Sequence, residues 1–155
     1  MKKNINLEYY HISPVKNLDS ILSEGIKSED KEIFVCDNET YLPMIASSQL
    51  FINEYSIFKI SNNGITDKII QDEVAELCSK NQYIILQNVI RPEHIVHVKN
   101  VTWNIWELNE HVNRLYSRML GLNEELNLER TVCISNEWCL YYNKKYNKAI
   151  ACITD

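Results

Sequence analysis

The sequence predicts an α+β fold with a mostly antiparallel sheet. Short β-branched and aromatic runs alternate irregularly with amphipathic stretches, without the regular strand–helix order of a parallel sheet. A chain of 155 residues has the length of one domain and can bury a full core without metals or disulfides. We therefore expect residues 1–155 to form a single domain. Its core covers 1–100, and a helix plus strands over 101–155 complete or extend it.

Composition excludes several classes of protein. Hydrophobic residues make up 45% and charged residues 24%, which is typical of a globular chain and excludes a disordered one. A formal net charge of -5 argues against broad, non-specific nucleic-acid binding. No apolar run is long enough for a membrane span or a signal peptide, so we expect no membrane association and a cytoplasmic location. Five cysteines without Cys-x-x-Cys spacing predict reduced thiols and no metal site.

The N-terminal region predicts a strand followed by a helix. Residues 9–12 favour a strand by composition. Ser13 and Pro14 then suit an N-cap and a first helical position. Apolar residues recur at three- and four-residue steps, as expected for one helix face: Val15, Leu18, Ile21, Leu22 and Ile26. Gly25 falls where such a helix would end.

The middle of the chain predicts further strands separated by turns. Strands are expected over 33–36, 55–60, 83–89 and 95–98. Helices are expected over 40–50, despite Pro43, and within 67–80. Asn62-Asn63-Gly64 is a strong turn signal after the strand that ends at residue 60.

The C-terminal region predicts one long helix and three strands. The helix over 103–120 carries an apolar stripe, formed by Trp106, Leu108, Val112, Leu115, Met119 and Leu120. We interpret this stripe as core packing, or as the seam of a homodimer or of a protein partner, rather than as a cofactor site. The strands are expected over 131–135, 138–142 and 149–153, with a hairpin between the last two.

Several short motifs fall in an order that resembles the ADP-ribosyltransferase superfamily, in its diphtheria-toxin-like and poly-ADP-ribose-polymerase-like His-Tyr-Glu branch. The opening motifs are Tyr9-Tyr10-His11-Ile12-Ser13, Asn17-Leu18, Ser20-Ile21-Leu22 and Glu24-Gly25-Ile26. The later ones are Ile33-Phe34-Val35, Asn81-Gln82-Tyr83-Ile84-Ile85 and Arg91-Pro92-Glu93-His94-Ile95. The resemblance covers about residues 9–98. It implies a split, mostly antiparallel β-sheet of ADP-ribosyltransferase type with flanking helices.

The resemblance also implies a nucleotide ligand, NAD, as substrate or bound molecule. His11 would then hydrogen-bond a ribose hydroxyl, and the Ile12 backbone would pair with the nicotinamide carboxamide. The Ser13 hydroxyl would support that amide. Phe34 and Tyr41 are candidate rings for stacking on nicotinamide, which offers an apolar face with a polar handle.

The catalytic carboxylate of the family has two candidates here. Gln82 occupies the position of the family's Glu, and it lacks the negative charge that stabilises a developing cation. Glu137, in Asn136-Glu137-Trp138, lies in a second stretch that resembles the same strand. Gln82 is the preferred position because the Pro92-Glu93-His94-Ile95 element follows it. Tyr41 is the nearest candidate for the family's Tyr.

We therefore expect an NAD- or ADP-ribose-binding protein that passes ADP-ribose to a protein or nucleic-acid acceptor. One alternative is an inactive binding protein of the same fold, which the Gln at position 82 favours. Another is an enzyme like the RNA 2′-phosphotransferases of the same superfamily. Structural roles also account for single residues: His11 would bond a backbone carbonyl, and Ser13 would serve only as an N-cap.

Overall fold

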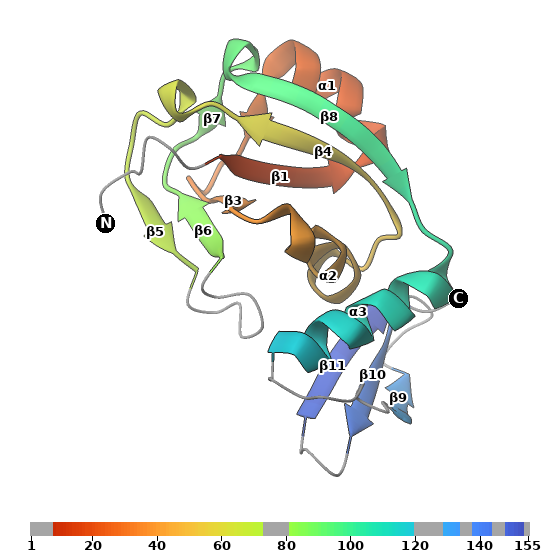
Figure 1. Ribbon diagram of the computed structural model, residues 1–155. Coiled ribbons are helices and arrows are strands. Elements are labelled where there is room, and N and C mark those ends of the chain that lie inside the picture. Colours follow the sequence, from red (N-terminus) through yellow and green to blue (C-terminus); the bar gives the residue numbers. More distant parts are fainter. Residues whose placement is uncertain (1–7, 73–80, 120–128, 134–137, 144–147, 154–155) are drawn as a thin grey trace. The chain divides into compact units, whose positions relative to one another are not determined.

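A computed structural model describes residues 8–72, 81–119, 129–133, 138–143 and 148–153 (Figure 1). The chain divides into two compact units. The first contains residues 1–40 and 55–101, and the second contains residues 41–54 and 102–155. Each unit is described by itself below. Among the described residues, no helix combines the length and the apolar character that crossing a membrane requires.

The first unit is built on a six-stranded sheet with the strand order β5-β6-β3-β1-β4-β8. The strands are β1 (Tyr9–Pro14), β3 (Ile33–Cys36), β4 (Glu54–Ile60), β5 (Ile69–Gln71), β6 (Gln82–Ile85) and β8 (Ile95–Thr102). The registers of β1 with β3 and β4, and of β6 with β3 and β5, are antiparallel. The prediction of an α+β fold with a mostly antiparallel sheet is therefore confirmed.

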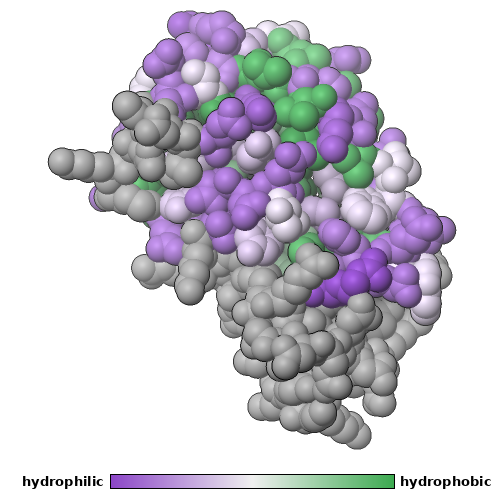
Figure 2. All heavy atoms as spheres, in the orientation of Figure 1, coloured by the Kyte–Doolittle hydropathy of each residue, from purple (hydrophilic) through white to green (hydrophobic). Residues whose placement is uncertain are grey.

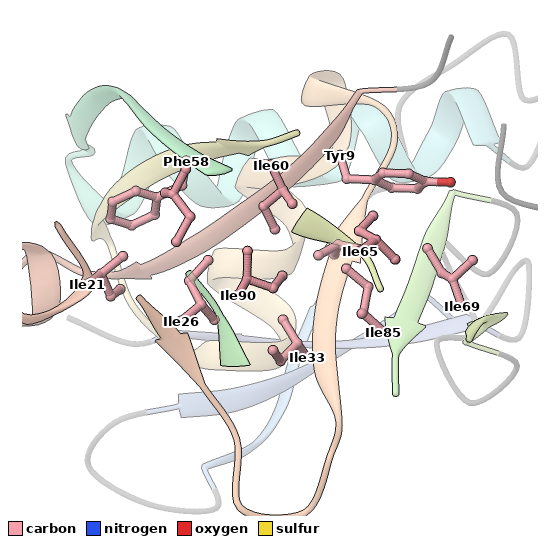
Figure 3. Packing of buried hydrophobic residues seen from close by; sticks show 12 residues of the cluster. Tyr9, Ile21, Ile26, Ile33, Phe58, Ile60, Ile65, Ile69, Ile85 and Ile90 are labelled. Carbon is pink, nitrogen blue, oxygen red and sulfur yellow. The ribbon is translucent and has the colours of Figure 1, made fainter. Parts of the chain in front are cut away.

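One face of this sheet carries the hydrophobic core of the first unit. Tyr9, Phe58 and Ile85 are at most 2% exposed and project from β1, β4 and β6 on the same side. Figure 3 shows the cluster, with Phe58 and Ile21 of α1 (Leu18–Glu24) toward one end, Ile90 of β7 (Val89–Ile90) in the middle, and Tyr9 and Ile85 toward the other end. β7 pairs with β2 (Ile26–Lys27) in a separate two-stranded sheet. Burial of this aliphatic cluster supplies the main stabilisation of the unit.

The start of the first helix differs from the prediction. Ser13 and Pro14 remain in β1, because the β1–β4 register continues through Ser13–Ser56 and Pro14–Tyr55. A short 3-10 turn over Val15–Asn17 then leads into α1. The expectation that Ser13 caps the helix is wrong, since strand pairing holds this residue in β1, before the helix begins. Gly25 ends α1 as predicted, with its N–H donating to the Ile21 carbonyl at 2.8 Å.

The helix expected within 67–80 is also wrong in part. Ile69–Gln71 forms β5, because Ile69 pairs with Ile85 and both side chains are buried in the core. Residues 73–80 lie outside the described part of the chain. The predicted turn at 62–64 is confirmed as the one-turn 3-10 segment Asn62–Gly64, and a second such segment, Pro92–His94, leads into β8.

The second unit combines helices with a three-stranded sheet. A 3-10 turn (Glu39–Tyr41) leads into α2 (Leu42–Ile45), which continues as a π-helical turn over Ala46–Leu50. α3 (Ile105–Met119) packs against this segment. The sheet has the order β11-β10-β9, with β9 (Glu129–Cys133), β10 (Trp138–Asn143) and β11 (Lys148–Ile153) antiparallel. The predicted helices and the β10–β11 hairpin are confirmed.

The apolar stripe of α3 is a packing surface within its own unit. Leu108, Val112 and Leu115 are at most 2% exposed, which fits the core-packing interpretation of the stripe. Trp106 is 70% exposed and does not belong to the buried face, contrary to the prediction. Asn104 caps the helix, since its Oδ1 accepts from the backbone N–H of Trp106 at 2.9 Å and of Glu107 at 3.3 Å.

Candidate functional site

The pairing of β1 with β3 stops after a single residue pair. Tyr10 opposes Cys36, and no further register pair between the two strands is found among the described residues. β1 nevertheless continues to Pro14 along its other neighbour, β4. The start of β1 thus pairs with the end of β3, and the two strands then part within the sheet. The parting occurs at His11 and Ile12, two of the candidate binding residues of the sequence motif.

Backbone alternation directs the Ile12 N–H and C=O toward β3. The Asp37 N–H donates to the Asn81 carbonyl just before β6, so the backbone N–H and C=O of Asp37 point toward β6. Those of the preceding residue, Cys36, therefore point toward β1. Tyr10 is paired with Cys36 and therefore directs its backbone groups to β3. Because alternate residues of a strand share this direction, Ile12 and Pro14 do the same. Pro14 has no N–H to offer there, which helps to end the pairing.

His11 occupies the place at which the strands part. Its Nδ1 lies 2.8 Å from the Phe34 carbonyl oxygen. A carbonyl only accepts, so the neutral ring carries its proton on Nδ1 and leaves Nε2 as an acceptor. The structural expectation for this residue, a bond to a backbone carbonyl, is therefore confirmed. The same bond fixes the tautomer in which Nε2 is able to accept a hydrogen bond from a hydroxyl.

Burial lowers the pKa of His11, and the hydrogen bond to the Phe34 carbonyl acts in the opposite direction. The unfolded chain has the ordinary value near 6.5, so it binds the proton more readily than the folded protein. The contribution of the neutral His11 ring to the free energy of unfolding is fully present above pH 6.5. It is lost as the pH falls through the pKa that His11 has in the folded protein. We expect the thermal midpoint of the wild type to fall from pH 7.5 to pH 5.

The variant His11→Asn isolates this contribution. Its amide can still donate to the Phe34 carbonyl but does not titrate. We expect the variant to lose part of the decline in midpoint between pH 7.5 and pH 5, as measured by circular dichroism. His94→Asn, in the turn before β8, is the matched control and should keep the decline. An identical pH profile for His11→Asn and wild type would contradict the neutral ring with a lowered pKa.

Ser13 adds a buried hydroxyl to the same strand. It is 7% exposed, and its Oγ accepts from Asn17 Nδ2 at 3.0 Å. Sequence reasoning used Asn17 only as part of a motif and gave its side chain no role. The spacing contains this signal, because an Asn four positions after a serine can turn back to it through a single helical turn.

Phe34 contacts His11 through its backbone, and its exposed ring projects from the opposite face of the sheet. Its carbonyl holds the imidazole, and its side chain is 48% exposed, a large value for an aromatic residue. Hydrophilic residues cover most of the coloured surface in Figure 2, where the apolar residues gather in one part of the face. An exposed aromatic side chain at the edge of the parting strands is suited to stacking on a planar ring.

Gln82 does not share the face of His11. Tyr10, Cys36 and Gln82 oppose one another across three strands, so their side chains lie on one face of the sheet. His11 follows Tyr10 and projects from the other face. Gln82 is 2% exposed and sits beside the buried Cys36. The register thus places the side chains of His11 and Ser13 on one face of the sheet. It places those of Ile12 and Phe34 on the other face, which is the face of Gln82.

The two remaining candidates lie elsewhere. Tyr41 belongs to the second unit, at the end of the 3-10 turn before α2. Glu137 lies outside the described residues. Neither is therefore assigned to the His11 site by the structure.

A polar cluster that sequence reasoning missed joins the ends of β3 and β6. Asp37 accepts from Asn81 Nδ2 at 2.8 Å and from the Tyr83 hydroxyl at 3.3 Å. Burial raises the pKa of Tyr83, and the Asp37 charge adds to this effect. Burial likewise raises the pKa of Cys36 to about 11, so its thiol is protonated at neutral pH and is no nucleophile.

This cluster holds the register that separates Gln82 from His11. Among the described residues, no group of three or more histidine, cysteine or acidic side chains is placed to hold a metal ion.

Comparison with protein-family models, with curated proteins and with solved structures finds no match for this chain.

Proposed function

We propose that the first unit binds NAD through its nicotinamide end, in a split sheet of ADP-ribosyltransferase type. The observation that carries this proposal is the early end of the β1–β3 pairing. Among the described residues the two strands form a register pair only at Tyr10 and Cys36, and the Ile12 N–H and C=O point toward β3 two residues further on. A primary carboxamide offers one acceptor and two donors. It can therefore hydrogen-bond both the N–H and the C=O of Ile12, as an added strand would.

The neighbouring side chains suit the rest of that ligand. Nε2 of His11 accepts a hydrogen bond, because Nδ1 is engaged by Phe34, and a ribose hydroxyl is a matching donor. The Phe34 ring projects from the opposite face of the sheet, so Phe34 contributes to this proposal through the carbonyl that fixes the imidazole. The lowered pKa of His11 keeps the ring neutral and accepting at physiological pH.

Binding is the part of the activity that these residues support best. Bound NAD supplies a glycosidic bond to nicotinamide that transferases break, and this chemistry depends on a carboxylate. Gln82 carries no charge and lies on the other face of the sheet. For transfer of ADP-ribose to a protein or nucleic acid, the sequence offers Glu137 as the other candidate carboxylate, and this residue lies outside the described residues.

The test is isothermal titration of the full chain with NAD. We expect saturable binding by the wild type and a loss of affinity of at least tenfold in His11→Ala, because the Nε2 acceptor is removed. His97→Ala is the matched control, since His97 lies on β8 and bonds Asn100 at 2.8 Å. Its affinity should stay within about twofold of the wild type.

Failure of the folded wild type to bind NAD at millimolar concentration would overturn the proposal. Equal affinities for wild type and His11→Ala would remove His11 from the site. Release of nicotinamide that depends on Glu137 and not on Gln82 would add transfer or hydrolysis to the binding function.

A further inference from the structure

The hydrogen bond from Asn17 determines whether the Ser13 hydroxyl can donate or accept in a further bond. A hydroxyl has one proton to donate and two lone pairs that accept. Asn17 Nδ2 donates to Ser13 Oγ at 3.0 Å, so this bond uses a lone pair and leaves the proton. Ser56, the cross-strand neighbour of Ser13, donates its own proton to Asn100 Oδ1 at 2.6 Å. Among the described residues, no acceptor takes the proton of Ser13.

Asn17 lies where the 3-10 turn Val15–Asn17 continues into α1. Its φ of -93° and ψ of -1° are helical, so it does not have the extended backbone from which an Asn side chain caps a helix. Its side-chain amide turns back to β1 and holds the buried Ser13 hydroxyl. This bond sets the orientation of the serine.

We propose that Asn17 is a positioning residue that fixes Ser13 as a hydrogen-bond donor, so that the site accepts a primary carboxamide and discriminates against the corresponding acid. This inference rests on the proposed NAD site. The Ser13 hydroxyl and the Ile12 N–H both require an acceptor, and the Ile12 C=O requires a donor. A carbonyl oxygen and an NH₂ group on one carbon meet these requirements. A carboxylate provides no donor and places its charge against the Ile12 carbonyl oxygen.

Ligand discrimination by the wild type is the first arm of the test. The probes are NAD and its acid counterpart, nicotinic acid adenine dinucleotide, in titration calorimetry. We expect NAD to bind at least tenfold more tightly. Equal or tighter binding of the acid would overturn the assigned ligand class.

Asn17→Asp is the second arm. The carboxylate is nearly isosteric with the amide, and it accepts the Ser13 proton that the ligand needs. The comparison uses NAD and its thionicotinamide analogue, which have the same charge but differ in acceptor strength. We expect the wild type to favour NAD severalfold and this ratio to fall toward one in Asn17→Asp. Asn17→Ala, which adds no charge, should lower the ratio in the same direction.

The controls separate this role from a structural one. Ser20→Ala, on the same helix, removes only a hydroxyl that bonds the Asn17 carbonyl and should leave the ratio unchanged. In a Ser13→Ala background, Asn17→Asp should no longer alter the ratio. An unchanged ratio in both Asn17 variants, with NAD still bound, would overturn the role of Asn17 alone. Absence of NAD binding by the folded wild type would overturn the proposed function and this inference with it.

Discussion

Replacing Gln87 with glutamate is expected to lower the free energy of unfolding by about 3–5 kcal/mol, a large part of a typical domain's stability. Gln87 is 7% exposed, and its Nε2 donates at 2.8 Å to both the Gly64 and the Val89 carbonyls. Its Oε1 accepts from the Thr66 N–H at 3.1 Å. The substitution points a carboxylate at two carbonyl oxygens and removes both donors. The measurement is the urea midpoint, followed by far-UV circular dichroism.

The pH dependence of this loss identifies its cause. Protonation of the introduced carboxylate restores one donor, so the deficit relative to wild type should shrink as the pH is lowered from 8 to 5. Asn88→Asp is the matched control, because its amide donates to Ser28 at an exposed position. That change should cost less than about 1 kcal/mol. A Gln87→Glu variant with the wild-type midpoint at pH 8 would contradict the buried amide network.

Gly25→Ala is expected to destabilise the first unit by a similar amount. Gly25 has φ 88° and ψ -179°, a conformation that side chains rarely adopt and that costs about 1–3 kcal/mol. A Cβ at this position would overlap the Ile90 carbonyl oxygen and approach Arg91 Cα. Relief requires movement of β7 away from β2, which opens the core at Ile26 and Ile90 and adds about 1–3 kcal/mol.

The matched control for this change is Ser23→Ala on the same helix. Its hydroxyl bonds only the Ser20 carbonyl at an exposed position, so the effect should stay within about 0.5 kcal/mol. Hydrogen exchange at the Ile26 and Ile90 amides should quicken in Gly25→Ala and not in Ser23→Ala. Equal protection in the two variants would show that the helix end tolerates a side chain.

The elements that the sequence predicted correctly carry local signals. The strand at Ile33–Cys36 and the helix that ends at Gly25 follow from β-branched composition and from a glycine stop. The helix expected after residue 67 failed for a non-local reason. Ile69 becomes part of a strand because Ile85, sixteen residues later, offers a buried partner. The apolar periodicity of one segment carries no information about a partner strand elsewhere in the chain.

The candidate site was predictable in part for the same reason. His11, Ile12 and Ser13 are consecutive, so one motif could locate them together. The relation between His11 and Gln82 depends on the register of three strands, which sets the face of each side chain. No spacing in the sequence fixes that register. The tautomer of His11 likewise depends on the Phe34 carbonyl, which is 23 residues away.

The most direct test of the proposed site is an NMR titration of uniformly ¹⁵N-labelled protein with NAD. If the carboxamide pairs with β1, the Ile12 amide and the His11 ring nitrogens shift saturably, with the same affinity that calorimetry reports. The His97 ring, on β8, should not move. Saturating NAD that leaves the Ile12 amide and the His11 ring unshifted, in protein with an otherwise folded spectrum, would contradict the site.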